Sequence, residues 1–330
     1  MGIVAVTGAN GFIGSRVVRA LLAKGRKVRA LVEPNSDLGN LADLSSQDLD
    51  VATCDVLDAA SLRKTLSGSE TLYHLAAVYK VWMQDPTPIY KVNVTGSTNA
   101  LLAARSSGVK KVVFTSSIAA LGLKEGGIAD ESTPFNTFDC ASDYHYSKWM
   151  SEEVALAFAK DGLHTVIVNP AFPFGPGDRA PTPTGKILLL VLRKEVPAML
   201  PGGLCAIDVD DCAEGHLLAE EKGVSGERYI LGNHNVSLRA LVELTAKEAG
   251  MKMWAPNVPK SIARAWASVS EMNAKRTHEE PPVTRRSAEY AMRSAYFSNA
   301  KAVRELGLPT RPLSETVRRA IEWFRHENMV

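Results

Sequence analysis

The chain has 330 residues, enough for one large α/β domain or two unequal domains with a sizeable core. Hydrophobic residues make up 45% and charged residues 22%, an ordinary globular composition that excludes an intrinsically disordered protein. A net charge of only +2 gives no electrostatic case for a nucleic-acid partner or for an acidic membrane surface.

The four cysteines lie far apart and never form a Cys-x-x-Cys pair, so the sequence predicts neither a metal site nor a disulfide framework. This usage favours a reduced, cytoplasmic protein. The first strand is expected to begin at residue 2 or 3, which leaves no room for a signal peptide. The longest apolar run, near residues 187–192, is too short to span a membrane.

The beginning of the chain predicts a dinucleotide cradle. Residues 3–6 form a short apolar strand, glycines follow at three-residue intervals, and a helical pattern then runs to Gly25. Glycines allow a tight turn and let a pyrophosphate approach the amides of a helix N-terminus, where the dipole favours negative charge. The glycine pattern alone is a weak signal, but its place after the first strand favours a cofactor site over a ligand-free turn. The expected cofactor contacts in this turn are Gly8, Asn10, Gly11, Phe12, Ile13 and Gly14.

The second strand, residues 27–32, ends at Glu33, about 20 residues after the glycines, where an acid binds the ribose hydroxyls of NAD. Residues 33–50 contain five acidic residues and no Lys or Arg that could pair with the extra phosphate of NADP. NAD is therefore the preferred cofactor and NADP the other possibility. The alternative for Glu33 is an exposed acid at a strand end.

Two further strand ends are predicted to contact the cofactor. After a third strand at residues 50–54, Asp55 can accept a hydrogen bond from adenine and Val56 can pack on the ring, unless Asp55 only begins the helix at 59–66. The fourth strand, residues 71–77, contains His74, which is expected in the core. It ends in three small or aliphatic residues that allow close approach, Leu75, Ala76 and Ala77.

The catalytic residues are expected on the next helices and strand. A helix at residues 89–107 contains Asn93 and Asn99, whose buried amides need partners. The fifth strand, 110–115, delivers Thr115 and Ser117 at the sheet edge where ligands sit.

A helix at 143–160 carries Tyr144 and Lys148 one turn apart on one face, and Tyr146, the competing tyrosine, lies on another face. A free phenol has a pKa near ~10, which a lysine ammonium and an oxidised nicotinamide would lower. Tyr144 is the predicted general acid/base, Ser117 would hold the substrate oxygen, and Lys148 would also bind the nicotinamide ribose.

The sixth strand, residues 165–169, completes a parallel, doubly wound sheet of the Rossmann type. Residues 172–185 are dense in Pro and Gly and are expected to be irregular, which places a domain boundary after Pro170. The predicted organisation is a dinucleotide-binding domain at 1–170, to which 206–232 returns, and a smaller, mostly helical substrate lobe at 171–330. Helices are expected at 187–194, 238–249, 261–275, 287–293 and 313–325. A basic stretch in this lobe is interpreted as a solvated helix face: Arg276, Arg285, Arg286 and Arg293.

With these residues placed, the chain resembles the extended short-chain dehydrogenase/reductase family along essentially its whole length. The resemblance is carried by Gly8, Gly11, Gly14, Asp55, Asn93, Ser117, Tyr144, Lys148 and Asn169-Pro170. It implies a water-network role for Asn93, a place near the nicotinamide for Pro170 and Phe172, and a homodimer through the helices at 89–107 and 144–160. Within the family, residues 177–186, 209–218 and 297–307 are most similar to the dihydroflavonol reductase-like branch, which includes hopanoid-associated sugar epimerases.

Three departures from the family's patterns bear on function. Reductases of this branch usually carry an arginine where Glu33 stands. Dehydratases carry an acid pair beside Thr115, where this chain has Ser116 and Ser117. Sugar-nucleotide epimerases commonly carry an arginine just before residue 207, where this chain has the uncharged run 204–206.

The leading function is an NAD(P)-dependent alcohol dehydrogenase or carbonyl reductase acting on a small, fairly apolar substrate. The candidate pocket residues are Phe172, Phe174, Trp82, Met83 and Leu200. The alternative enzyme is a sugar epimerase that keeps its NAD bound and shows no net redox turnover. A cofactor-sensing regulator is the third class, but such a protein has no need of Tyr144 and Lys148.

Overall fold

A parallel sheet of seven strands organises the computed structural model, which describes residues 2–277, 281 and 283–330. In spatial order the strands are β3 (Leu49–Thr53), β2 (Val28–Val32), β1 (Ile3–Thr7), β4 (Ser69–His74), β5 (Lys111–Thr115), β6 (Thr165–Pro170) and β9 (Arg228–Leu231). All neighbouring strands in this order are parallel. The predicted doubly wound fold is confirmed, and the strand order reverses direction at β1 and β4, where such folds bind ligands.

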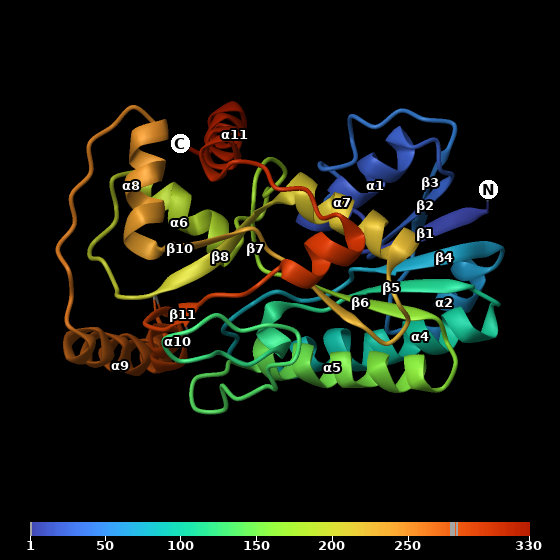
Figure 1. The fold of residues 1–330 in the computed structure, drawn as a ribbon, viewed down its shortest axis with the longest axis horizontal. Helices are drawn as coiled ribbons and strands as arrows, with labels where there is room; N and C mark the ends of the chain where they lie inside the picture. The colour runs from blue at the N-terminus through green and yellow to red at the C-terminus, as the bar shows by residue number, and fades with distance from the viewer. Residues whose placement is uncertain (1, 278–280, 282) are drawn as a thin grey trace.

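Helices cover both faces of this sheet (Figure 1). One face carries α1 (Phe12–Ala23) and α7 (Val209–Lys222), and the other carries α2 (Ala59–Leu66), α4 (Ser97–Ser106) and α5 (Asp143–Lys160). Strand β1 shows why: Val4 and Val6 enter one hydrophobic core and Ala5 enters the other. A strand buried on both faces needs a continuous apolar run, which is the pattern that the sequence has there.

The expected helix at 89–107 is present, but its middle is a π-helical turn. The structure divides it into α3 (Thr87–Tyr90), η1 (Lys91–Gly96) and α4. Other short turns are η2 (Ile118–Ala120) and η3 (Ala302–Leu306).

The remaining strands form a second, four-stranded sheet that the sequence did not predict. Its centre is β8 (Gly203–Asp208), which pairs with β7 (Phe172–Phe174), β10 (His234–Ser237) and β11 (Ser294–Ala295). Three helices share a core with it: α6 (Pro183–Leu192), α8 (Leu238–Glu248) and α11 (Leu313–His326). Beyond them lie α9 (Lys260–Thr277) and α10 (Arg285–Ala291), which pack on each other.

The prediction that residues 172–185 are irregular is wrong at both ends. Phe172–Phe174 is a strand, and α6 begins at Pro183. Proline is tolerated at these two places because β7 pairs only with β8 and because the first turn of a helix needs no N–H donor from that position.

Candidate functional site

The glycine turn between β1 and α1 has the shape of a phosphate cradle. Gly8 has a φ of +64°, and a Cβ there would lie 2.9 Å from the Ala76 backbone. A Cβ at Gly14 would lie 2.1 Å from the Gly8 carbonyl oxygen. Gly11 is the N-cap of α1 and supplies no side-chain cap, which leaves the first N–H groups of the helix available to an anion. These residues fit a dinucleotide pyrophosphate.

The floor beside this turn is built by the end of β4. The Thr7 hydroxyl accepts hydrogen bonds from the N–H groups of Leu75, at 3.1 Å, and Ala76, at 3.2 Å. His74 joins Thr7 to Ser97 through contacts of 2.9 and 3.0 Å, and burial lowers its pKa to about 3. His74 is therefore a neutral core residue, as predicted, and it fixes the strand end beneath the cradle.

The residues expected at the adenosine end lie on two loops beside the turn. Glu33 follows β2 directly and is exposed. The Asp55 carboxylate accepts from the Leu57 N–H at 2.8 Å, and the Asn99 amide donates to the Val56 carbonyl at 3.1 Å. These bonds fix the chain between β3 and α2.

Asn10 ties the cradle to the segment after β2. Its amide donates to the Asp37 carbonyl at 2.8 Å. Asn40 donates to the carbonyls of Asn10, at 3.1 Å, and Gly177, at 2.9 Å. Phe12 and Ile13 begin α1 directly after the glycine turn, and Ala77 lies in the connection after β4, which ends at His74 and not at residue 77 as predicted. Pro170 and Phe172 lie where β6 leads into β7.

The π-helical turn brings Asn93 to α5. Its amide donates to the Val78 carbonyl and to the Ser147 hydroxyl, at 3.1 and 2.9 Å, and its oxygen accepts from the Val78 N–H at 2.7 Å. Ser147 in turn donates to the Tyr144 carbonyl at 2.8 Å. The side chain is buried, and one acceptor position of its oxygen is left for the water that the resemblance implies.

Tyr144 and Ser117 are brought together, as the sequence predicted. Burial raises the pKa of Tyr144, the nearby Tyr79 phenol raises it further, and a hydrogen bond from Ser117 opposes both effects. The phenol is therefore protonated at neutral pH in the protein itself. Tyr146 donates instead to the Phe138 carbonyl at 3.0 Å, which removes it as the competing acid/base.

Lys148 points at the end of β5. Its ammonium donates to the Thr115 carbonyl at 2.7 Å, and the side chain is buried. Burial lowers the pKa of Lys148 to about 8, although the charge of Glu152 opposes this shift. The predicted cation therefore lies at the sheet edge next to Ser117 and Tyr144.

A buried network that the sequence reading missed supports Ser117 from behind. Asn169 donates to the Ser117 carbonyl at 3.0 Å and to the Glu152 carboxylate at 2.6 Å. Arg228 of β9 donates to the same carboxylate at 2.7 Å, and Glu152 is fully buried. Glu152 lies one turn after Lys148, which was a usable signal, but nothing in the sequence places Arg228 opposite it.

The walls around Tyr144 are aromatic. The Tyr79 ring lies 4.7 Å from the Tyr144 ring, and Tyr290 of α10 lies 4.6 Å from His145. Of the predicted pocket residues, Phe174 is buried in the core of the second sheet and Leu200 packs against the cluster of α9 and α10. Phe172 bridges two cores and Met83 is half-buried.

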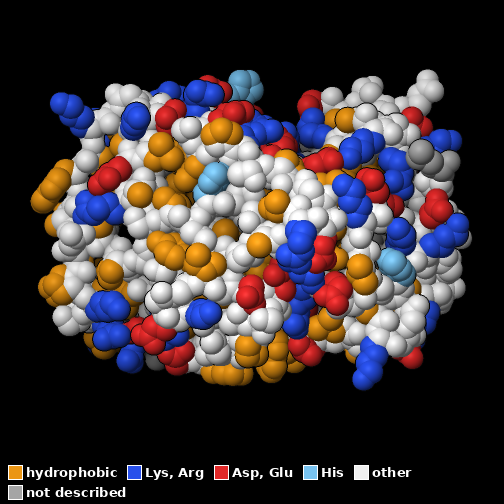
Figure 2. Space-filling model, in the orientation of Figure 1, with side chains coloured by type: hydrophobic (Ala, Val, Ile, Leu, Met, Phe, Trp, Pro, Cys, Tyr) orange, Lys and Arg blue, Asp and Glu red, His pale blue; other side chains and the backbone are white. Residues whose placement is uncertain are grey.

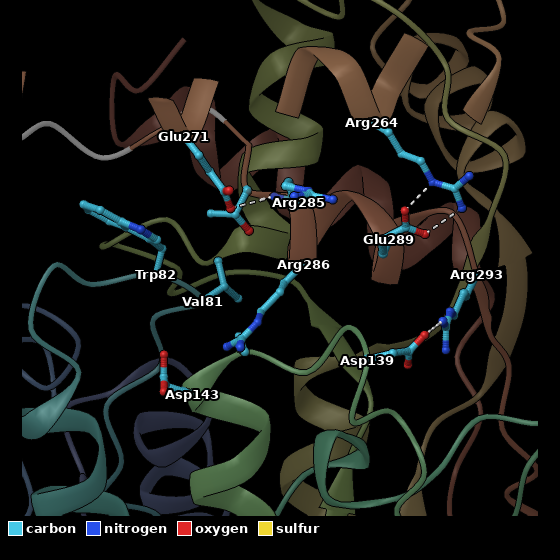
Figure 3. Close-up of a pocket in the computed structure, with 12 residues that line it drawn as sticks. Val81, Trp82, Asp139, Asp143, Arg264, Glu271, Arg285, Arg286, Glu289 and Arg293 are labelled. Atoms are coloured by element: carbon cyan, nitrogen blue, oxygen red, sulfur yellow. Dashed lines mark hydrogen bonds and ion pairs between the residues drawn. The ribbon is translucent and has the colours of Figure 1, made fainter. Parts of the chain in front are cut away.

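A cavity of about 690 Å³ lies beside the N-terminus of α5 (Figure 3). Its lining comes from the loop after Tyr79, from α5 and from the helices α9 and α10. The lining residues are Val81, Trp82, Asp139, Ser142, Asp143, Arg264, Glu271, Thr284, Arg285, Arg286, Glu289 and Arg293.

Several charged side chains of this cavity are held by ion pairs or hydrogen bonds. Arg264 pairs with Glu289, and Arg293 pairs with Asp139. Asp143 accepts from the Tyr90 hydroxyl at 2.9 Å, and Glu271 accepts from the Arg285 backbone N–H at 2.8 Å.

Arg286 extends from α10 toward the N-terminus of α5 (Figure 3), and within the described part of the chain neither its guanidinium nor that of Arg285 forms an ion pair. The four arginines predicted to form one solvated helix face are therefore divided. Arg285, Arg286 and Arg293 line the cavity, whereas Arg276 is exposed on α9.

Among the residues that the structure describes, no three His, Cys, Asp or Glu side chains are arranged to hold a metal ion. No helix within 2–277, 281 and 283–330 has the length and apolarity needed to cross a bilayer. All four cysteines are free and buried.

The chain matches one family model and is similar to several known proteins over nearly its whole length. Residues 4–232 match the model of the NAD dependent epimerase/dehydratase family. A putative dihydroflavonol 4-reductase of Synechocystis sp. is 38% identical over 98% of this chain and 95% of its own. Sterol demethylase protein B of Methylococcus capsulatus is 31% identical over 98% of this chain and 99% of its own. The crystal structure of gox2253 has a TM-score of 0.87, with 40% identity and 98% coverage of both chains.

Proposed function

Because the chain belongs to the NAD dependent epimerase/dehydratase family, whose members are enzymes of the extended short-chain dehydrogenase/reductase type, we propose that it reduces the carbonyl group of a small apolar substrate. The observation that carries the proposal is the proximity of Ser117 to the Tyr144 phenol, with the Lys148 ammonium at the Thr115 carbonyl beside them, at the sheet edge next to the glycine cradle. NADH, when bound, supplies the hydride to the carbonyl carbon.

The protein's own groups then act on the carbonyl oxygen. Ser117 donates a hydrogen bond that holds the oxygen, and Tyr144, protonated at neutral pH, gives it the proton that completes the alcohol. Lys148 would hold the cofactor ribose, and its ammonium stabilises the negative charge that Tyr144 carries after it has given up the proton. In the oxidative direction the same groups act in reverse.

Two relatives support an apolar, ring-containing substrate. Their names, dihydroflavonol 4-reductase and sterol demethylase protein B, refer to fused-ring molecules of low charge. The aromatic side chains of Tyr79, Tyr144 and Tyr290 offer flat faces to such rings. We therefore propose a cyclic ketone or the corresponding secondary alcohol.

The cofactor is NAD in this family, and we propose that Glu33 selects it by repelling the phosphate of NADP. The proposed division is a cofactor domain at 1–170 with 206–232, and a substrate lobe made of the rest of 171–330. The pairing of β9 with β6 at the edge of the first sheet supports this division. A cytoplasmic homodimer through α4 and α5 is also proposed, supported by Leu102 and Met150, which are large, apolar and exposed on those helices.

A sugar epimerase is the second candidate, and one observation favours it. Arg285 and Arg286 give the cavity guanidinium groups that an anionic sugar substrate could use. Against it, residues 204–206 are buried within β8 and supply no cation there.

Net redox turnover distinguishes the two candidates. Wild-type protein, mixed with NADH and a panel of cyclic ketones, is expected to oxidise NADH in proportion to alcohol formed, and to prefer NADH over NADPH. Tyr144→Phe is expected to lower kcat by 10²–10⁴-fold with little change in NADH binding, because it removes only the proton donor. Interconversion of sugar epimers with no net NADH loss would contradict the reductase and establish the epimerase.

A further inference from the structure

Helix α9 presents its large apolar side chains to solvent and its small ones to the protein. The inward face consists of Ala263, Ala267, Ser270 and Ala274, all less than 9% exposed. The outward face consists of Ile262, Trp266, Val269 and Met272, which are 57%, 48%, 57% and 57% exposed. Their spacing of four, three and three residues puts them on one side of the helix. A soluble surface helix has the opposite arrangement, so the outward face is expected to be covered when the protein works.

The segment that carries this face has a local excess of basic residues. Residues 251–277 contain five basic residues and one acidic residue, a net charge of +4, whereas the whole chain has +2. Lys252, Lys260 and Arg276 are exposed within it. Figure 2 shows basic and apolar side chains together over the end of the molecule that α9 forms in Figure 1. The small net charge of the chain hides this local excess.

Two exposed tryptophans add a second property. Trp254, in the connection that leads into α9, is 82% exposed, and Trp266 lies in the centre of the outward face. Tryptophan is favoured at the boundary between headgroups and acyl chains, because its ring is apolar and its N–H is polar. An apolar helix face with tryptophan and surrounding lysine and arginine is typical of a helix that lies on an anionic lipid surface.

A second copy of the chain is a poorer occupant of this face. In a two-fold dimer the same patch meets itself, so the basic segments of the two copies would oppose each other. An anionic surface instead neutralises them.

We propose that the outward face of α9 docks the protein on an anionic membrane surface without spanning it. Arg264 and Glu271 of the same helix line the cavity at the N-terminus of α5, so the helix that docks is also one wall of that cavity.

Vesicle flotation of the full-length protein, without substrate or cofactor, tests the docking. The protein is expected to float with vesicles that contain phosphatidylglycerol and to float weakly with pure phosphatidylcholine, and 0.5 M salt should release it. Replacing both Trp266 and Val269 with Ser is expected to weaken binding at least ten-fold. Lys260→Glu and Arg276→Glu are each expected to weaken it by about five-fold or more.

Val224→Ser is the matched control, because Val224 is 56% exposed after α7 and should leave flotation unchanged. Activity on a water-soluble ketone checks that each variant is folded, and it tests the proposed function separately from docking. Absence of flotation, or equal flotation of the double Ser variant and wild type, overturns the proposal. A dimer that dissociates on Trp266→Ser, with no vesicle binding, overturns it in favour of a second copy as the occupant.

Discussion

Lys148 is the residue whose protonation should limit activity near neutral pH. Burial holds its pKa at about 8, so the ammonium is present below that pH and is lost as the pH rises through it. We expect kcat/KM for NADH to fall above pH 8, because neutral lysine no longer holds the cofactor ribose or favours the tyrosinate. Initial rates between pH 6 and 10 measure this.

Lys148→Arg separates this group from others that titrate nearby. A guanidinium stays charged throughout the range, so the variant, although slower, is expected to keep its activity to higher pH. If the variant loses activity at the same pH as wild type, the fall belongs to another group.

The candidate catalytic residues could be placed from sequence because each lies at a position that local pattern defines. Ser117 follows an apolar strand, and Tyr144 and Lys148 are one helical turn apart. Their supports could not be predicted. Arg228, which lies 76 residues after Glu152, meets it only because β9 pairs with β6.

At the scale of elements, strands with a local apolar pattern could be predicted from sequence. The strands that form only by pairing with a neighbouring strand could not. Apart from β3, which contains Asp50 and is partly exposed, strands β1 to β6 have apolar centres, and the predicted bounds of all six differ from the structure by three residues or fewer. The segment His234–Ser237 has one aliphatic residue and is a strand only because β8 offers it hydrogen-bonding groups. In the same way, no local pattern shows that Arg285 and Arg286 face a cavity.

A buried carboxylate, Asp178, lies just before α6, and its effect on the free energy of unfolding depends on pH. Asp178 is 2% exposed and accepts from the Thr182 N–H and hydroxyl, each at 2.9 Å. Burial raises its pKa from 3.8 to about 6, and the Thr182 bonds only partly oppose this. The folded state therefore binds the proton more tightly than the unfolded state. The stabilisation that the folded state gains from binding this proton is complete below pH 3.8 and is lost as the pH rises through 6.

Asp178→Asn removes this titration. Relative to wild type, the free energy of unfolding of the variant is expected to rise by about 2 kcal/mol between pH 4.5 and 7.5, from the two pKa values. Urea unfolding at both pH values measures the change. Asp58→Asn, at the exposed N-cap of α2, is the control and should show little change. A constant difference between Asp178→Asn and wild type would mean that Asp178 stays ionised.

At the scale of the whole molecule, one ion-pair cluster ties the C-terminal helix to both sheets. Arg319 of α11 donates to the two carboxylate oxygens of Asp208 at 2.9 and 2.8 Å, and it also pairs with Asp210. Asp208 ends β8 and caps α7, while Asp210 pairs with Arg16 of α1. The cluster thus connects α11 and the second sheet to the two helices that cover one face of the first sheet.

Removing Arg319 should therefore cost much more than removing a surface arginine. The Asp208 side chain is fully buried, and without Arg319 its one remaining cationic partner among the described residues is Arg311, at 3.6 Å. We expect Arg319→Ala to lower the free energy of unfolding by about 3 kcal/mol, because a buried charge loses its main partner. Arg304→Ala breaks the more exposed pair with Glu305 and should leave the free energy of unfolding nearly unchanged, because an exposed pair is screened by solvent. Urea unfolding at pH 7 compares the two, and equal losses would show that the cluster does not hold the lobes together.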